Sequence, residues 1–271
     1  MRSPKIPKRS PTSSAVPASD FGLPGNVRHN LPRLVPAPAP APNIYIDGTY
    51  LQKNPSLHSE ESPWKVKQIT QIMERHKIFP NSVCEIGCGA GEVLRLLQQT
   101  LDPHCVLCGY EISPQAYELC KPKANTKLSF KLMDIRQENK EVIFDLVLVL
   151  DVIEHLEDYF NFLRDIKPRG RFTIFHFPLD LSAQTVLRKN GLMKRRNMYA
   201  HLHYFTKDIA IQTLREVGYE VLDYCYTPRS NDLGWELIQK ILKVPRTLGF
   251  AVAKDLTVRV LGGYSLLVLA A

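Results

Sequence analysis

The chain has 271 residues, 44% of them hydrophobic, and a formal net charge of +8 at pH 7. This length can bury one sizeable core, and the composition is that of an ordinary globular protein. The charge is uneven, because residues 1–43 hold six Lys or Arg and a single acid, Asp20. Only +3 remains for residues 44–271, which speaks against a nucleic-acid partner for the body of the chain.

Residues 1–43 also contain ten of the twenty prolines and end in "LVPAPAPAPN". This composition favours polyproline II and cannot build a packed core, so we predict a disordered, Pro-rich basic tail. The tail lacks the apolar stretch of a secretory signal, and no run in the sequence approaches the roughly 18 apolar residues of a membrane span. We therefore expect a cytoplasmic protein with no membrane partner.

Residues 44–80 form a separate predicted segment, a lid followed by a helix. The lid is polar with scattered aromatics, and "PWKVKQITQIMERHKI" after it has helical periodicity. Tyr50, Trp64 and Lys65 are candidate cover residues over a site. Trp64 could equally pack against a sheet as part of the core.

Residues 81–271 alternate between short β-branched runs and helical segments. The predicted strands are "SVCEIG", "CVLCGYE", "KLSFKLMD", "FDLVLVLDVI" and "RFTIFHFP", followed late in the chain by a helix from residue 207, a sixth strand and the final run "GYSLLVLA". Continuous apolar strands such as 146–150 imply a sheet that is covered on both faces. We therefore predict a doubly wound, mostly parallel α/β domain, with residues 233–260 partly helical.

The six cysteines do not form a recognisable metal or disulfide pattern. Cys105 and Cys108 in "CVLC" have the spacing of half a zinc site, but they lie in a strand-like run. In a strand, an offset of three puts two side chains on opposite faces, so the thiols could not bind one ion. We expect reduced cysteines that pack as small apolar residues.

The stretch "VCEIGCGAGEVLRLL" places Gly87, Gly89 and Gly91 between a strand-like and a helix-like run. Open α/β sheets bind nucleotides at such turns, although a tight turn with no ligand is an alternative. A dinucleotide site is a second alternative, but the third glycine comes one residue too early for GxGxxG, and no P-loop sequence is present. Glu85 and Glu92 beside the glycines would repel a pyrophosphate and attract a cationic cofactor.

Acidic residues follow consecutive predicted strands. Glu111 ends the second strand, where a carboxylate can accept hydrogen bonds from both hydroxyls of a ribose. Asp134 follows the third strand and could accept from an exocyclic amine of adenine, while Asp151 and Glu154 follow the fourth. The carboxyl ends of parallel strands meet at one edge of a sheet, so these acids are expected to line one cleft.

Taken in order, these motifs resemble the class I S-adenosylmethionine-dependent methyltransferases. The features that carry the resemblance are "EIGCGAG", the acids after strands two and three, and "DVIEHL" after strand four. Within that superfamily the chain is most similar to the small-molecule methyltransferases related to the ubiquinone-biosynthesis O-methyltransferases, over residues 60–271. The resemblance implies a Rossmann-like, seven-stranded sheet with an antiparallel last strand, in a methyltransferase domain that covers residues 81–271.

The resemblance also implies which residues bind S-adenosylmethionine. Glu85 and residues 87–91 would border the methionine part, Glu111 would hold the ribose, and Asp134 with Ile135 would border the adenine. Asp151 would lie near the methionine ammonium or the substrate mouth. The full implied set is Glu85, Gly87, Cys88, Gly89, Gly91, Glu111, Ile112, Asp134, Ile135 and Asp151.

We therefore predict an S-adenosylmethionine-dependent methyltransferase (EC 2.1.1) that moves a methyl group to an O or N atom of a small molecule. The alternative is a methyltransferase acting on a protein or RNA that the basic tail helps to bind. A non-catalytic module that kept the fold is a third hypothesis, which the intact glycine loop argues against.

Asp151 is one candidate catalytic residue. The segment "HLHYFT" supplies two more, His201 and His203. In an extended segment the two imidazoles share a face and could point together into the cleft. They could bind a metal if His155 and Asp151 converged with them, or they could be structural, but no third ligand is obvious and we predict no metal site. We favour His203 as a general base or substrate holder, because it lies nearer to the following helix.

Overall fold

The computed structural model describes residues 44–228 and 236–271, without the side chains of residues 236–243. The predicted tail, residues 1–43, therefore lies outside the described residues. The described residues belong to one compact unit, and the boundary predicted at residue 80 stays a prediction. In the described segments, no helix has both the length and the apolarity needed to cross a membrane.

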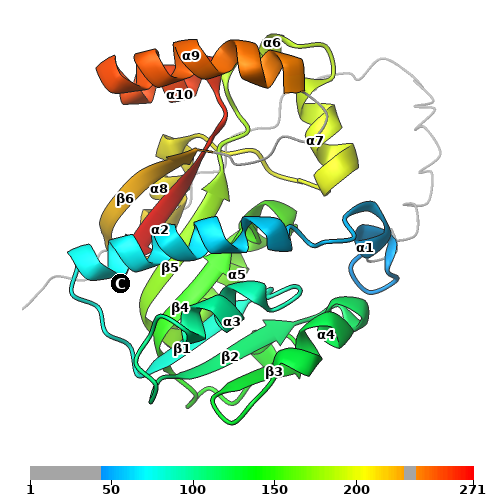
Figure 1. Cartoon of the computed structure of the whole chain (residues 1–271), viewed down its shortest axis with the longest axis vertical. Helices are drawn as coiled ribbons and strands as arrows, with labels where there is room; N and C mark the ends of the chain where they lie inside the picture. The colour runs from blue at the N-terminus through cyan, green and yellow to red at the C-terminus, as the bar shows by residue number, and fades with distance from the viewer. Residues whose placement is uncertain (1–43, 229–235) are drawn as a thin grey trace, which may run out of the picture. The chain divides into compact units, whose positions relative to one another are not determined.

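A seven-stranded sheet runs through this unit in the order β3-β2-β1-β4-β5-β7-β6 (Figure 1). Its strands are β1 (Ser82–Ile86), β2 (Val106–Glu111), β3 (Leu128–Leu132), β4 (Phe144–Leu150), β5 (Gly170–Pro178), β6 (Val221–Pro228) and β7 (Tyr264–Ala270). Strands β1 to β5 pair in parallel, and β7 is antiparallel to both of its neighbours. The predicted mostly parallel sheet with an antiparallel last strand is confirmed.

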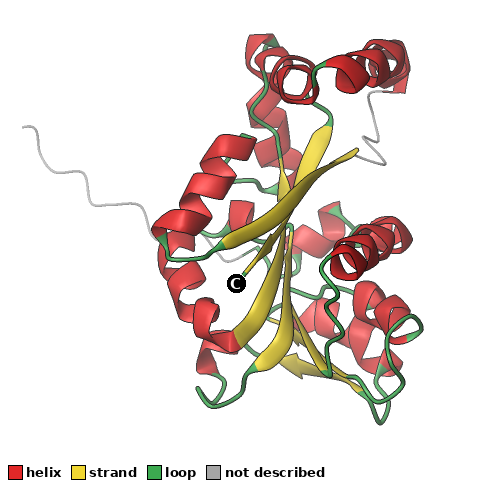
Figure 2. Ribbon diagram, turned by 90° about the vertical axis from the view of Figure 1, so that its left-hand side faces the viewer, coloured by secondary structure: helices red, strands yellow, loops and turns green. Residues whose placement is uncertain are grey.

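Helices cover both faces of the sheet (Figure 2). The helices of the described residues are α1 (Thr49–Lys53), α2 (Ser62–Arg75), α3 (Glu92–Gln98), α4 (Pro114–Cys120), α5 (Tyr159–Ile166), α6 (Ala183–Leu187), α7 (Gly191–Tyr199), α8 (Lys207–Glu216), α9 (Glu236–Val252) and α10 (Lys254–Leu261). Strand β4 shows why both faces are covered. Leu146 and Leu148 pack in a buried cluster with α2 and α3, whereas Val147 and Val149 pack in a second cluster with α5 and α8. Apolar side chains therefore alternate between two cores, as in other doubly wound sheets.

The structure differs from the predicted elements mainly in its helices. We predicted partial helix for residues 233–260, of which 233–235 lie outside the described residues. From residue 236 to 261 the chain is helical except at Ala253. Pro245 lies inside α9, and Ala253 separates α9 from α10, so the segment contains a helix-disfavouring residue and a break. Helix α7 was not predicted separately, because its residues lack a regular apolar stripe.

The cysteines pack as predicted. All six lie in the described part of the chain as free thiols, five of them buried. Cys105 and Cys108 of "CVLC" belong to different core clusters on opposite faces of the sheet, so the two thiols do not meet.

The strand order reverses direction between β1 and β4. From β1 the chain builds outward through β2 to β3, and then returns to β4 on the other side of β1. Loops that leave the carboxyl ends of two such strands diverge and leave a crevice, which is the usual ligand site of an open α/β sheet. The fold therefore positions a site where the glycine turn after β1 meets the turn after β4.

Candidate functional site

A cavity of about 250 Å³ lies at this crevice. The turns after β1, β2 and β4 and the end of β5 form its walls, and residues from 45–65 and α7 cover it. Most of the predicted site residues line this one cavity: Glu85, Gly87, Cys88, Gly89, Glu111, Ile112, Asp151 and His201, with the predicted cover residues Tyr50, Trp64 and Lys65. The structure thus brings together residues that the sequence separates by more than a hundred positions.

Four predicted residues, all in the described part of the chain, lie outside this lining: Gly91, Asp134, Ile135 and His203. Asp134 caps the 3₁₀ turn that follows β3 and pairs with the guanidinium of Arg136 at 2.6 Å, while Ile135 is buried in the core. The ring of His203 packs against Tyr159, with 4.7 Å between ring centroids. The choice of His203 over His201 does not fit this geometry, and the adenine contacts of Asp134 and Ile135 stay a prediction.

Glu111 fixes the shape of the glycine turn. Its Oε2 accepts a hydrogen bond from the backbone N–H of Gly89 at 2.8 Å. Its Oε1 accepts from the N–H groups of Ile112 and Ser113 at 2.9 and 2.8 Å. Burial raises the pKa of Glu111, although these three N–H groups oppose the shift. Oε1 already accepts two hydrogen bonds, whereas Oε2 accepts one and keeps a further lone pair, so the same side chain can also accept from a ligand hydroxyl.

Two glycines of the turn have different roles. Gly89 and Gly91 both adopt positive φ, +53° and +73°. A Cβ at Gly91 would lie 2.7 Å from the Phe130 ring and 2.8 Å from Cys120, inside the core. A Cβ at Gly89 would meet only Leu57, at 3.7 Å, on the cavity side. Gly91 is therefore required by packing, whereas Gly89 borders the space for a ligand.

We expect Gly91→Ala to lower the free energy of unfolding by about 2–4 kcal/mol. Overpacking a core costs about 1–3 kcal/mol, and the left-handed backbone adds about 1 kcal/mol for a residue with a Cβ. Gly89→Ala is the matched control, since it shares the backbone strain without the clash and should lose only about 1 kcal/mol. Urea denaturation of both variants measures the difference. Equal losses would show that Gly91 is not a packing residue.

Glu85 is a buried carboxyl at the end of β1 that lines the cavity. Its side chain is 3% exposed, and its Oε2 has no hydrogen-bond partner among the described residues. Burial raises its pKa to about 8, with Lys65 lowering it and Glu111 raising it. A buried acid at a cavity wall is stabilised in its ionised form by a cationic ligand, which would supply the missing partner.

Asp151 is already held by other side chains. Its carboxylate lies 2.7 Å from the Nζ of Lys65 on α2 and 2.7 Å from the Nδ1 of His176 on β5. The Nε2 of His176 lies 3.1 Å from the hydroxyl of Thr227. Burial alone would raise the pKa of Asp151, but His176 and Lys65 outweigh it and hold the pKa well below its usual range. Such a carboxylate is a poor proton acceptor and ties α2 to the sheet.

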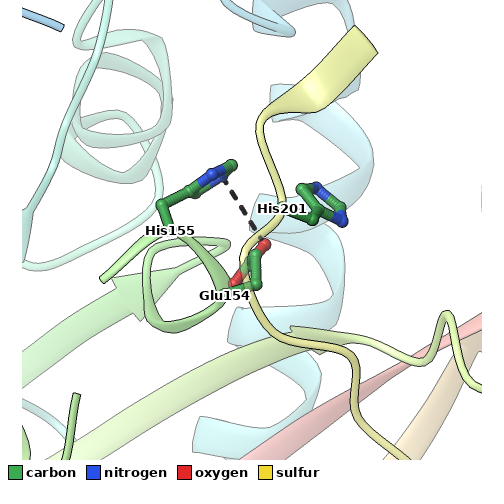
Figure 3. A group of neighbouring side chains, drawn as sticks. All are labelled: Glu154, His155 and His201. Atoms are coloured by element: carbon green, nitrogen blue, oxygen red, sulfur yellow. Dashed lines mark ion pairs between the residues drawn. The ribbon is translucent and has the colours of Figure 1, made fainter. Parts of the chain in front are cut away.

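The other end of the cavity is lined by Glu154, His155 and His201 (Figure 3). Glu154 and His155 belong to the 3₁₀ turn η4 (Ile153–His155) that follows β4, and His201 lies just after α7. The backbone N–H groups of Leu202 and His203 donate to the carbonyl of Glu154 at 2.7 and 3.1 Å, which docks the histidine segment against η4. The Nε2 of His155 lies 3.9 Å from the Oε1 of Glu154.

Both imidazoles are oriented through their Nδ1 atoms. The Nδ1 of His201 lies 2.5 Å from the carboxylate of Asp180, which follows β5. The Nδ1 of His155 lies 3.3 Å from the carbonyl oxygen of Ala200. Burial, with His201 adding to it, lowers the pKa of His155 to about 4, so that ring is neutral at pH 7. In the neutral imidazoles these acceptors place the hydrogen on Nδ1 and leave a lone pair on Nε2.

Residues of the segment 45–65 and of α7 cover this end of the cavity. The rings of Tyr45 and Tyr50 lie 5.8 and 6.0 Å from the ring of His155. The side-chain amide of Asn54, just after α1, donates to the carbonyl of Met198 in α7 at 3.4 Å. The N-terminal segment and α7 are thereby joined above the histidines.

Sequence reasoning missed three residues that the structure places at this site: Tyr45, His176 and Asp180. Asp180 had a usable signal, because it follows the fifth strand just as the other predicted acids follow theirs. His176 is an imidazole in an otherwise apolar strand, which marks a buried polar partner. Nothing in the sequence pattern singled out Tyr45.

Comparison with known proteins identifies the chain's relatives. A family profile described as a methyltransferase domain matches residues 26–224, well over half of the chain. The chain belongs to the methyltransferase domain family. The predicted methyltransferase activity is thereby confirmed at the level of EC 2.1.1.

Three relatives of this methyltransferase have informative names. Nodulation protein S of Rhizobium tropici is 26% identical over 165 residues, which span 52% of this chain and 67% of the relative. The N-methyltransferase NodS of Bradyrhizobium japonicum WM9, solved with S-adenosylhomocysteine, has a TM-score of 0.51 and 18% identity, covering 82% of this chain and 97% of NodS. Magnesium protoporphyrin IX methyltransferase of Synechocystis PCC 6803, also with S-adenosylhomocysteine, has a TM-score of 0.51 and 17% identity, covering 76% and 81%. The two structures share this fold.

S-adenosylmethionine is the cofactor of this methyltransferase, as predicted. When bound, it supplies a methyl group activated by a sulfonium. The residues present fit it, because the Glu85 oxygen without a partner suits an ammonium and Gly89 leaves room beside the turn. Glu85 would hold the methionine ammonium and Glu111 the ribose hydroxyls.

We expect Glu85→Gln to remove the proton release that accompanies cofactor binding near pH 7. With a pKa of about 8, Glu85 is mostly protonated in the unliganded protein, and a cationic ligand favours its ionised form. Native protein should therefore release close to one proton, and its affinity should rise with pH up to about 8. Calorimetry in buffers of different ionisation enthalpy measures this release. The same release in the variant would assign the proton to another group.

The same variant has a predicted effect on stability. A folded-state pKa raised from 4.5 to about 8 means that the unliganded native chain loses stability as pH rises between these values. Glutamine cannot ionise, so Glu85→Gln should melt at a higher temperature than native protein above about pH 8.

Proposed function

We propose that this methyltransferase moves a methyl group to an O or N atom of a small molecule that binds at the Glu154–His155–His201 end of the cavity. The observation that carries the proposal is that residues from 45–65 and α7 cover this part of the cavity. Tyr45 and Tyr50 approach His155, and the Asn54–Met198 hydrogen bond joins the cover segments above it. An acceptor enclosed in this way must be small, or must present a slender part.

The named relatives support this class of acceptor. One is named as an N-methyltransferase and another as a methyltransferase of magnesium protoporphyrin IX, a small molecule. The near-neutral charge of residues 44–271 supports it as well, because an enzyme acting on RNA would need a basic face.

In methyl transfer the protein contributes mainly by aligning the acceptor atom with the methyl group of the cofactor. The acceptor atom forms a bond to the methyl carbon while the carbon–sulfur bond breaks and its electron pair stays on sulfur. A hydroxyl or ammonium acceptor must also lose a proton. We assign contact with the acceptor to His201, which Asp180 orients, and we assign Asp151 the positioning of Lys65 and α2.

A transfer experiment with methyl-labelled S-adenosylmethionine tests the proposal. The full chain is incubated with fractionated extract that contains metabolites, RNA and protein, and each fraction is counted. We expect label in the metabolite fraction, and Glu111→Ala serves as the inactive control. Label confined to RNA or to protein would replace the small-molecule acceptor with the alternative one.

A further inference from the structure

We propose that Glu154, His155 and His201 bind one divalent transition-metal ion at the acceptor end of the cavity. Each residue offers one ligand atom, and these atoms lie within 4.8 Å of one another. Figure 3 shows the three side chains converging from the turn after β4 and from the segment after α7. Metal–ligand bonds to imidazole and carboxylate are about 2.0–2.2 Å long, so one ion can reach all three atoms after small side-chain rotations.

The surroundings of the two histidines are those of metal ligands. A ligating imidazole characteristically donates its second ring N–H to a carboxylate or a backbone carbonyl, which orients the ring. Here Asp180 accepts from His201 and the carbonyl of Ala200 accepts from His155, at 2.5 and 3.3 Å. Both Nε2 atoms are thus left as donors of a lone pair. A general base would need only one imidazole oriented by an acceptor at its Nδ1. The structure orients two imidazoles in this way, as a pair of metal ligands requires.

The ligand set favours a particular class of ion. Two imidazoles and one carboxylate suit Zn²⁺ and similar transition metals, whereas Mg²⁺ and Ca²⁺ prefer a set made of oxygen atoms. The site is also incomplete on one side, because all three residues line the cavity. Three protein ligands with an open position are the arrangement of a catalytic zinc site.

This site differs from the metal arrangement considered from the sequence. That arrangement combined Asp151 and His155 with both histidines of "HLHYFT". The structure engages Asp151 with Lys65 and His176 instead, and packs His203 against Tyr159. Glu154 supplies the ligand that the earlier set lacked.

The open position gives the ion a role that rests on the proposed function, with His201 acting on the acceptor through the ion instead of touching it. An acceptor hydroxyl that becomes the fourth ligand loses its proton more readily, because the cation stabilises the resulting alkoxide or phenolate. The O–H bond breaks and the proton passes to water. The oxygen then forms its bond to the methyl carbon, and the electron pair of the broken carbon–sulfur bond remains on sulfur.

The binding test uses the untagged full chain after treatment with a chelator. Calorimetric titration with Zn²⁺ should show one saturable site, and Co²⁺ in its place should give visible absorption bands of a low-coordinate complex. We expect Glu154→Gln, His155→Gln and His201→Gln each to weaken Zn²⁺ binding by about 100-fold or more, and Asp180→Asn by about 10–100-fold. His76→Gln is the matched control, since His76 pairs with Asp223 away from the cavity and should leave binding unchanged.

Melting curves of each variant, recorded without metal, show whether weaker Zn²⁺ binding comes from loss of a ligand or from misfolding. If a ligand variant does not fold, the Zn²⁺ affinity of Asp180→Asn still tests the site, because this variant keeps all three ligands. No saturable Zn²⁺ site in the native chain, or equal affinity in His201→Gln, would overturn the proposal. Binding of S-adenosylhomocysteine by the chelator-treated chain tests the methyltransferase site independently. Full methyl-transfer activity in the presence of chelator would overturn the ion's role in deprotonating the acceptor.

Discussion

Replacing Glu111 by alanine is expected to weaken binding of S-adenosylmethionine by about 100-fold or more. A charge-assisted hydrogen bond contributes about 1.5–3 kcal/mol, and the free lone pair of the Glu111 Oε2 can accept one from a ribose hydroxyl. A second effect adds to the first, because the Glu111 carboxylate also accepts from the N–H groups of Gly89, Ile112 and Ser113. The variant should therefore fold, melt at a lower temperature than native protein, and bind neither the cofactor nor its demethylated product.

Calorimetry with S-adenosylhomocysteine measures this loss. Glu118→Ala is the control, because Glu118 is an exposed glutamate of α4 that pairs only with Lys121 at 3.6 Å among the ion pairs of the described residues. It should bind normally. Retained affinity in Glu111→Ala, with a melting curve that shows a folded chain, would remove Glu111 from the cofactor site.

Replacing His201 by glutamine is expected to reduce turnover by about 10²–10⁴-fold while leaving affinity for S-adenosylhomocysteine close to native. Removing a group that manages the acceptor's proton, or that holds the ion which does so, typically costs this much. Glu85 and Glu111, the proposed cofactor contacts, lie at the carboxyl ends of β1 and β2, on other elements than His201, so we expect them to be undisturbed. Steady-state transfer rates with an acceptor found by the labelling experiment, together with calorimetry, separate the two effects.

His203→Gln is the informative comparison for this variant. His203 lies two residues away in the same segment, but its ring packs against Tyr159 outside the cavity lining. Near-native turnover is expected. A large loss in His203→Gln with little effect in His201→Gln would restore the sequence-based choice and would require the segment to be repositioned in the active enzyme.

The sequence was most informative where a residue type is forced by backbone geometry or by a strand end. The glycine turn must follow β1, and acids at the carboxyl ends of parallel strands must lie at one edge, so Glu85, Glu111 and Asp151 could be expected to meet. The same logic would have found Asp180 if it had been applied to the strand that ends at Pro178.

The sequence was least informative where tertiary packing decides between neighbours. His201 and His203 alternate in the same short segment, and only the docking of that segment on the Glu154 carbonyl determines which ring enters the cavity. Gly91 shows a related limit, because the sequence pattern did not reveal that Phe130 and Cys120 leave no room for a Cβ there, while its place beside the cofactor stays a prediction. Asp134 pairs locally with Arg136, an interaction that no periodicity predicts.

A crystal structure of the full chain with S-adenosylhomocysteine tests the central claim most directly, that the cavity after β1, β2 and β4 is the cofactor site. We predict the ribose hydroxyls within hydrogen-bond distance of Glu111, the amino group beside Glu85, and the sulfur directed toward the end formed by His155 and His201. A ligand bound elsewhere on the chain, or lying in this cavity with its sulfur directed away from these histidines, would contradict the account.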